Sequence, residues 1–141
     1  MTNINNVLFL CTGNSCRSQM AEAIVIARYK GSWKAHSAGT SPAGFVHPKA
    51  IQVLEEIGIQ HRGESKHVDS LVGIDFELVV TVCDDAAENC PLWPGSGRTI
   101  HQGFPDPAQA EGSDKEILEV FRQVRDEISE FIADYLFNSL E

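Results

Sequence analysis

The stretch VLFLCTGNSCRSQMAE, residues 7–22, decides the fold that we expect for this chain. Its first part is continuously apolar and ends at Cys11, which is typical of a strand buried on both faces of a sheet. A short loop that contains Gly13 follows, and the residues after Arg17 repeat apolar side chains at helical spacing. A strand, a tight loop and a helix in this order predict an anion-binding site, because backbone N–H groups at a helix N-terminus converge on one point.

The rest of the chain alternates between strand-like and helix-like segments. Strands are predicted over 7–11, 35–39, 78–83 and 98–101, and helices over 18–29, 48–57, 84–89 and 113–135. This alternation predicts a single α/β domain over residues 1–141, with a four-stranded parallel sheet and helices on both faces. Ligands of such sheets bind beyond the carboxyl ends of the strands, so Cys11, Cys83 and the loop after His101 should lie near the site.

Charge and cysteine content restrict the classes of partner. The formal net charge of -9 argues against nucleic acid, because nucleic-acid-binding proteins usually carry a basic face. The amino-terminal apolar run is too short for a signal peptide or a membrane span, so we expect a cytoplasmic protein without a membrane partner. In the reducing cytoplasm, 4 cysteines favour catalysis, redox chemistry or metal binding over a disulfide framework.

The loop between Cys11 and Ser18 is the predicted functional site. The Arg17 guanidinium matches a tetrahedral oxyanion, and its charge, together with the helix dipole, favours the thiolate form of Cys11. A thiolate surrounded by N–H donors is a nucleophile directed at a phosphorus-like centre. The predicted oxyanion-binding residues are Thr12, Gly13, Asn14, Ser15, Cys16, Arg17 and Ser18.

The motif CTGNSCRS after a first strand resembles that of the low-molecular-weight protein tyrosine phosphatases, and FPDP at 104–107 resembles their general-acid loop. This resemblance implies that Asp106, followed by Pro107, protonates the leaving oxygen. Those phosphatases usually place tyrosine after the Asp-Pro pair, whereas Ala108 follows here.

The segment VCDDAAENCP adds two cysteines that hydrolysis of a phosphoester would not need. With it, nearly the whole chain resembles the thioredoxin-coupled arsenate reductases built on the phosphatase fold, through the motifs CTGNSCRSQMAE, SAG, PKAI, LVVTVC…NCP, DP and QVRDEI. The resemblance implies that arsenate, with phosphate as a competitor, binds to Arg17 and the loop amides and is attacked by Cys11. Cys83 and Cys90 then pass the oxidation to thioredoxin, without a cofactor or a catalytic metal, and the reaction detoxifies arsenic.

Some members of that family bind potassium through residues that match Asn14, Glu22 and Ser37. The resemblance assigns Cys16 no chemical role, so we interpret it as packing or loop support. The five histidines show no metal-ligand spacing and are interpreted as helix caps or surface groups.

Two other functions remain open from the sequence. A phosphatase of the same fold would hydrolyse phosphomonoesters and would need only the first cysteine. A zinc-binding module would use all four cysteines, although Cys11 and Cys16, and likewise Cys83 and Cys90, lack the short knuckle spacing of such sites.

Overall fold

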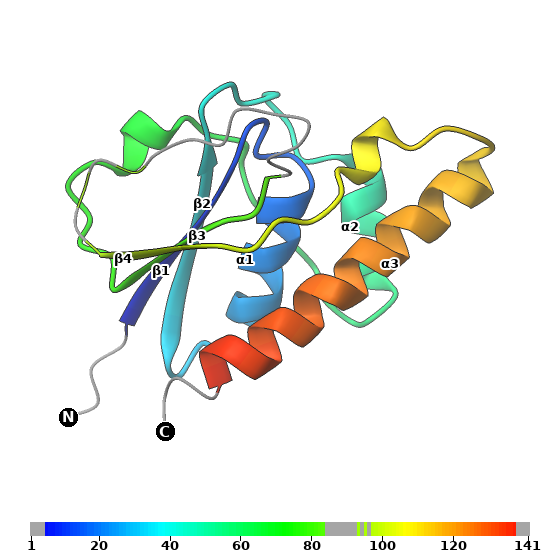
Figure 1. The fold of residues 1–141 in the computed structure, drawn as a ribbon. Helices are drawn as coiled ribbons and strands as arrows, with labels where there is room; N and C mark the ends of the chain where they lie inside the picture. Colours follow the sequence, from blue (N-terminus) through cyan, green and yellow to red (C-terminus); the bar gives the residue numbers. More distant parts are fainter. Residues whose placement is uncertain (1–4, 84–92, 94, 96, 138–141) are drawn as a thin grey trace.

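The four strands of this chain form one parallel sheet in the order β2-β1-β3-β4 (Figure 1). The computed structural model describes residues 5–83, 93, 95 and 97–137. The strands are β1 (Asn5–Cys11), β2 (Trp33–Gly39), β3 (Leu78–Thr81) and β4 (Arg98–His101). In the register of the sheet, Cys11 pairs with Gly39, and Leu10 pairs with Ala38 on one side and Thr81 on the other. All strands therefore end at the same edge, with Cys11 as the last residue of the central strand β1.

Three α-helices pack against this sheet, and the chain also forms three shorter helical elements within the described residues. The α-helices are α1 (Arg17–Arg28), α2 (Pro48–Glu55) and α3 (Asp114–Ile132), and the shorter elements are η1 (Val68–Leu71), η2 (Pro107–Gln109) and η3 (Ala133–Phe137). Pro48 begins α2, where its fixed φ suits the first helical turn. Ser113 and Glu116 form a capping box that satisfies backbone N–H groups at the start of α3.

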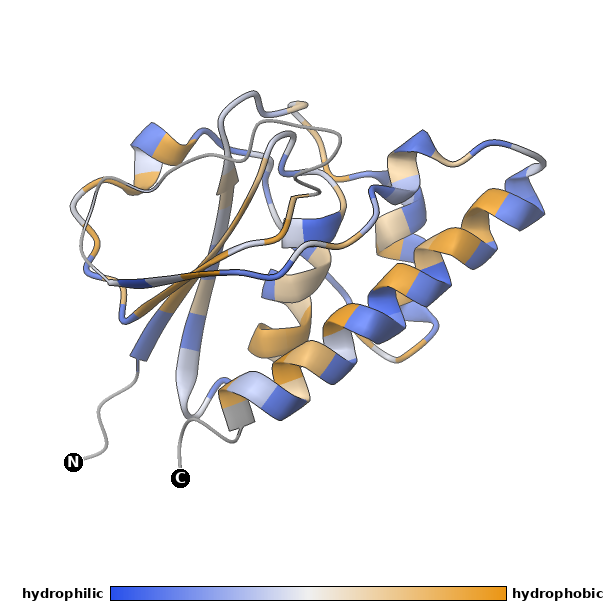
Figure 2. Cartoon of the chain, viewed as in Figure 1, coloured by the Kyte–Doolittle hydropathy of each residue, from blue (hydrophilic) through white to orange (hydrophobic). Residues whose placement is uncertain are grey.

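The alternation of side chains along the strands divides the interior into two clusters. Val7 and Phe9 belong to the larger cluster, which α1, α2 and α3 cover. Leu8 and Leu10 point to the opposite face and pack in a smaller cluster with Leu71 of η1. Figure 2 shows hydrophobic residues along the central strands and α1, and an alternation of hydrophobic and hydrophilic residues along α3. The site edge is thus supported by buried side chains on both faces of β1.

The predicted fold class is confirmed, and the element boundaries agree within a few residues. The predicted strand 98–101 coincides with β4, whereas the predicted strand 78–83 ends at Thr81. Within the described part of the chain, η1 packs against the face of the sheet opposite the α-helices. The predicted helix 84–89 lies outside the described residues. None of the helices that the structure describes is both long and apolar enough to cross a membrane.

Candidate active site

The loop between β1 and α1 surrounds a cavity of about 470 Å³. Its lining comprises the loop itself together with two residues from the segment around η2, namely Cys11, Thr12, Gly13, Asn14, Ser15, Cys16, Arg17, Asp106 and Gln109. Six of the seven predicted oxyanion-binding residues therefore line one cavity, and Ser18 lies buried behind it. Gln109 was not predicted, because nothing in its local sequence indicates that η2 turns toward the loop.

Two donors surround the thiol of Cys11, which is 2% exposed at the end of β1. The backbone N–H of Asn14 donates to Cys11 Sγ at 3.2 Å, and Ser18 Oγ lies 2.9 Å from the same sulfur. Asn14 Nδ2 donates to Ser18 Oγ at 2.8 Å, which leaves the hydroxyl proton of Ser18 available to the sulfur. These two contacts hold the Cys11 sulfur at the cavity, in a position from which a cysteine could act as a nucleophile.

Asn14 has an unusual backbone conformation that its buried side chain holds in place. Its φ is 48°, in the left-handed region, which asparagine tolerates better than most residues. Its Oδ1 accepts from Gln19 Nε2 at 3.0 Å and from the backbone N–H of Lys66 at 2.9 Å. The turn that brings the Asn14 N–H onto Cys11 is therefore fixed from outside the loop.

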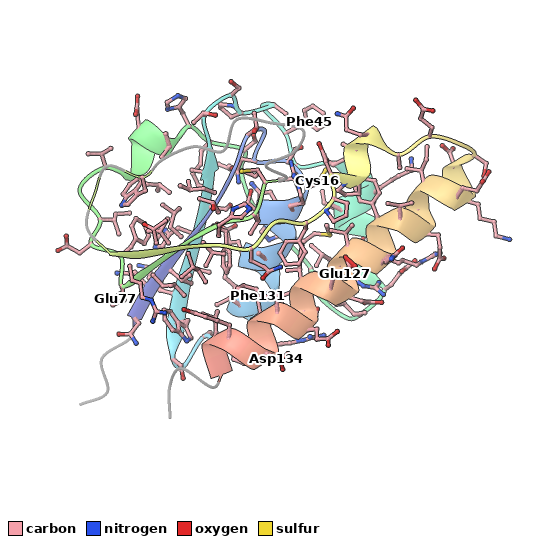
Figure 3. All side chains as sticks on the ribbon, in the orientation of Figure 1. Cys16, Phe45, Glu77, Glu127, Phe131 and Asp134 are labelled. Carbon is pink, nitrogen blue, oxygen red and sulfur yellow. The ribbon has the colours of Figure 1, made fainter. Side chains whose placement is uncertain are left out.

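A second loop, 41–47, fixes the orientation of the peptide groups. Its backbone N–H groups donate to three carbonyls of the first loop, in the pairs Ser41 to Thr12 at 3.0 Å, Ala43 to Gly13 at 2.9 Å and His47 to Ser15 at 2.9 Å. Because C=O and N–H point in opposite directions across a trans peptide, these bonds direct the next N–H groups toward the cavity. Figure 3 shows Cys16 at the amino-terminal end of α1 and Phe45 on the neighbouring loop 41–47.

Arg17 joins this loop to the segment that carries Asp106. The guanidinium is 3% exposed, and its Nη1 donates to the carbonyl of Phe104 at 3.2 Å. Its Nη2 lies 3.6 Å from Asp106 Oδ2, and the other carboxylate oxygen, Oδ1, accepts from the backbone N–H of Ala108 at 3.0 Å. A guanidinium, which is suited to binding an oxyanion, and a carboxyl group, which can donate a proton when protonated, thus line the same cavity as Cys11.

Cys16 also lines the cavity, but its environment disfavours the thiolate. Burial, with a smaller contribution from Asp106 and Cys11, raises the pKa of this thiol to about 12, although the Ser15 hydrogen bond and the Arg17 charge act in the opposite direction. Cys16 therefore stays protonated near neutral pH and belongs to the larger buried cluster. These facts favour the interpretation of Cys16 as packing rather than as a nucleophile.

The structure describes one of the two predicted relay cysteines. Cys83 follows β3, is completely buried in the same cluster as Cys11, and is not among the residues that line the cavity. It is disulfide-bonded, whereas Cys11 and Cys16 are free. The backbone 102–104 runs close to it, since a Cβ on Gly103 would lie 3.0 Å from the Cys83 carbonyl oxygen. Cys90 lies outside the described residues, so its place in the relay stays a prediction.

A buried polar network lies behind the loop. Glu22 is 6% exposed and accepts a hydrogen bond from Ser37 Oγ at 3.1 Å. Burial raises the pKa of this carboxyl, while Lys66 and the Ser37 hydrogen bonds act in the opposite direction. His61 Nε2 lies 2.7 Å from Gln19 Oε1 and 3.7 Å from Glu22 Oε2. Gln19 in turn donates to Asn14, so the network reaches the loop between β1 and α1, which is the predicted oxyanion loop.

The histidine interpretation is partly wrong. His47 and His67 accept hydrogen bonds as helix caps, at the starts of α2 and η1. The side chain of His61, however, is 5% exposed and belongs to the network around Glu22. The sequence gives no sign of this, because the partners of His61 lie about forty residues away along the chain.

The residues that match the potassium ligands of the family do not fit a potassium ion here. Lys66 Nζ lies 3.9 Å from Glu22 Oε1, so an ammonium group already faces this carboxylate. Asn14 Oδ1 accepts two N–H donors, which leaves it poorly placed to coordinate a cation. Across the part of the chain that the structure describes, no group of three or more histidine, cysteine, aspartate or glutamate side chains could hold a metal ion.

Comparison with known proteins agrees with this geometry. Residues 6–141 match the family described as low molecular weight phosphotyrosine protein phosphatase. The arsenate reductase of Shouchella clausii is 46% identical over 125 residues, which cover 86% of this chain and 88% of that protein. A solved arsenate reductase in the phosphate-binding state has a TM-score of 0.75 at 30% identity, covering 96% of this chain and 98% of its own.

A phosphatase structure is also similar to this chain. The low molecular weight protein tyrosine phosphatase of T. tengcongensis has a TM-score of 0.74 at 28% identity, covering 96% of this chain and 99% of its own. The chain therefore belongs to the low molecular weight phosphotyrosine protein phosphatase family and is similar in sequence and in fold to arsenate reductases.

Proposed function

We propose that this protein reduces arsenate to arsenite and so detoxifies arsenic. The observation that carries the proposal is the Cys11 thiol, which accepts a hydrogen bond from the loop backbone and faces a cavity that Arg17 and Asp106 also line. The names of the relatives at 40% identity and above support arsenate as the oxyanion. Phosphate has the same shape and charge, so it should bind as a competitor.

The first step forms a bond between sulfur and arsenic. The Cys11 thiolate attacks arsenate, a sulfur–arsenic bond forms, and one arsenic–oxygen bond breaks. Asp106 gives its proton to the departing oxygen, which leaves as water. Arg17 and the loop N–H groups bind the remaining oxygens, where they stabilise the negative charge of the transition state. This step leaves arsenic in its +5 state.

The next steps transfer two electrons to arsenic through the cysteines. The first of these steps needs the reduced enzyme, in which the disulfide of Cys83 has been opened. The Cys83 thiolate then attacks Cys11 Sγ, a disulfide forms, and the electron pair of the broken sulfur–arsenic bond stays on arsenic, which leaves as arsenite. Cys90 then attacks Cys83 and frees Cys11 as a thiolate. The dithiol of thioredoxin reduces the resulting Cys83–Cys90 disulfide, so two thiols are oxidised for each arsenate reduced.

Sequence features support this relay and its location. If 83–90 were fully helical, its terminal Cα atoms would be about 10 Å apart, beyond the roughly 7 Å that a disulfide allows. Bridging Cys83 and Cys90 would therefore unwind such a helix and make the segment a redox switch. The proposal places the reaction in the cytoplasm, where thiols are kept reduced, and gives it no nucleic-acid or membrane partner.

A phosphatase reaction at the same site is the second candidate. The T. tengcongensis phosphatase has the same fold, and Cys11, Arg17 and Asp106 would suffice for hydrolysis of a phosphomonoester. Ala108 stands where the phosphatases usually carry tyrosine, and hydrolysis gives no role to Cys83. These two features favour the reductase.

The deciding experiment counts arsenite released per enzyme in a single turnover, with disulfides mapped by mass spectrometry. Cys90→Ser should release about one arsenite and then stop as a Cys11–Cys83 disulfide, because no third thiol remains. Cys83→Ser should release none and hold arsenic on Cys11. Cys16→Ser tests whether the effect is specific to the relay thiols: the variant should release more than one arsenite per enzyme with thioredoxin, even if its oxyanion binding is weaker.

The same variants distinguish the two candidate functions. Both Cys83→Ser and Cys90→Ser should keep any phosphatase activity, which needs neither residue. Sustained thioredoxin-driven turnover by Cys90→Ser at the wild-type rate would rule out the three-cysteine relay. A parallel assay with glutaredoxin and glutathione in place of thioredoxin identifies the reductant.

A further inference from the structure

Lys66 lies at the point where the buried network meets the oxyanion loop. Its backbone is held on both sides, because its N–H donates to Asn14 Oδ1 at 2.9 Å and its carbonyl accepts from the Gly39 N–H at 3.0 Å. Its Nζ donates to the Glu64 carbonyl at 3.0 Å and lies 3.9 Å from Glu22 Oε1 of α1. One residue thus contacts the loop through its backbone and the carboxylate behind the loop through its ammonium.

The charge balance of the network assigns the role of cation to Lys66. The Glu22 side chain is 8% exposed, and a buried carboxylate without a partner cation is costly. His61 is not that cation, because burial and the Lys66 charge both lower the pKa of its ring. Neutral His61 can donate from Nε2 to Gln19 Oε1, which leaves the Gln19 amide to donate to Asn14. Among the residues described, Lys66 carries the only ammonium or guanidinium group within 4.0 Å of Glu22.

We propose that Lys66 is a built-in cation for this network, which positions the oxyanion loop through Glu22 and Asn14 without a bound potassium ion. Lys66 is a positioning residue, since it touches neither the sulfur of Cys11 nor the cavity. Its side chain is 27% exposed, so the ammonium reaches Glu22 from the solvent side, where a dissolved cation could replace it. The proposal extends the proposed function, but it concerns oxyanion binding rather than electron transfer.

The test compares Lys66→Met with the wild type in potassium chloride and in choline chloride at equal ionic strength. The substitution removes the charge and keeps both backbone hydrogen bonds. The readouts are phosphate affinity by calorimetry, the rate of Cys11 alkylation by iodoacetamide, and the midpoint of thermal unfolding. We expect the wild type to behave alike in both salts. Lys66→Met should bind phosphate about tenfold more weakly in choline chloride and recover part of that loss in potassium chloride.

Two further variants serve as controls. Lys34→Met removes an exposed lysine of β2 and should match the wild type in every readout. Lys66→Arg keeps the charge and should keep most of the phosphate affinity, so it separates the charge from a general loss of folding. A wild-type protein that binds phosphate more tightly or unfolds at higher temperature in potassium than in choline would overturn the proposal. Unchanged phosphate affinity in Lys66→Met would also overturn it.

None of these readouts requires arsenate reduction. If the protein failed to reduce arsenate but the Lys66 variants behaved as expected, the proposed function would be contradicted and the proposed role of Lys66 would still be supported. If arsenate reduction were found and the salt comparison failed, only the role of Lys66 would be wrong.

Discussion

Replacing Asn14 by alanine should destabilise the protein and weaken oxyanion binding, because one side chain supports the geometry of the whole loop. Asn14 is completely buried and has a φ of 48°. Its side chain donates to Ser18 Oγ and accepts from Gln19 Nε2 and from the Lys66 N–H. Alanine can make none of these bonds and disfavours the left-handed conformation.

The expected cost follows from two of these losses. The Lys66 N–H would lose its acceptor, and a buried donor without a partner costs about 1–3 kcal/mol. Gln19 Nε2 would keep the carbonyl oxygens of Asn14 and Glu64 as acceptors, so it adds little. Holding alanine in the left-handed region costs about 1–2 kcal/mol. The free energy of unfolding should therefore fall by about 2–5 kcal/mol, a large share of the 5–15 kcal/mol typical of a domain.

Urea denaturation monitored by circular dichroism measures this loss, with the slope of the transition unchanged. Ser15→Ala is the matched control, because among the residues that the structure describes the Ser15 hydroxyl hydrogen-bonds only to Cys16 Sγ, at 3.6 Å. It should change the free energy of unfolding by less than about 0.5 kcal/mol. A loss below about 1 kcal/mol in Asn14→Ala, or equal losses in both variants, would refute the idea that Asn14 holds the loop.

Four other predictions follow from the site and from the half-buried His36. Asp106→Asn should slow formation of the Cys11–arsenic adduct on the order of a hundredfold in single-turnover kinetics and leave phosphate affinity largely intact; an unchanged rate would mean that another group supplies the proton. Cys11→Ser should abolish arsenate reduction and any phosphatase activity, and turnover by this variant would contradict the role of Cys11. High phosphate should raise the KM of the wild type for arsenate without lowering kcat, and an unchanged KM would contradict the proposed site. Burial, with the nearby charges of Lys34 and Lys66, lowers the pKa of His36. As the pH falls, His36 is therefore protonated in the unfolded chain before it is protonated in the folded protein. The free energy of unfolding present above pH 6.5 should decline as the pH falls through the folded-state pKa of His36. An NMR titration that gives His36 a pKa above 6.5 would contradict this prediction.

The secondary-structure pattern of this chain could be predicted because it depends on local chemistry. A continuous apolar run predicts β1, the capping box of Ser113 and Glu116 predicts the start of α3, and the alternation of the two patterns predicts a parallel sheet. The parallel sheet then predicts that the loop after Cys11 and the segment of Asp106 meet at one edge. The cavity confirms that meeting.

The sequence by itself determined the fold class and the loop around Cys11 that we propose to bind the oxyanion, because consecutive residues and their spacing encode them. Only the tertiary structure decided which groups hold that loop from behind. Asn14 and Lys66 are separated by 52 positions, and the bond between them exists because the segment before η1 pairs with the end of β2. The identity of the cation beside Glu22 was likewise decided in three dimensions, because a buried carboxylate selects its partner by distance and desolvation rather than by position in the chain.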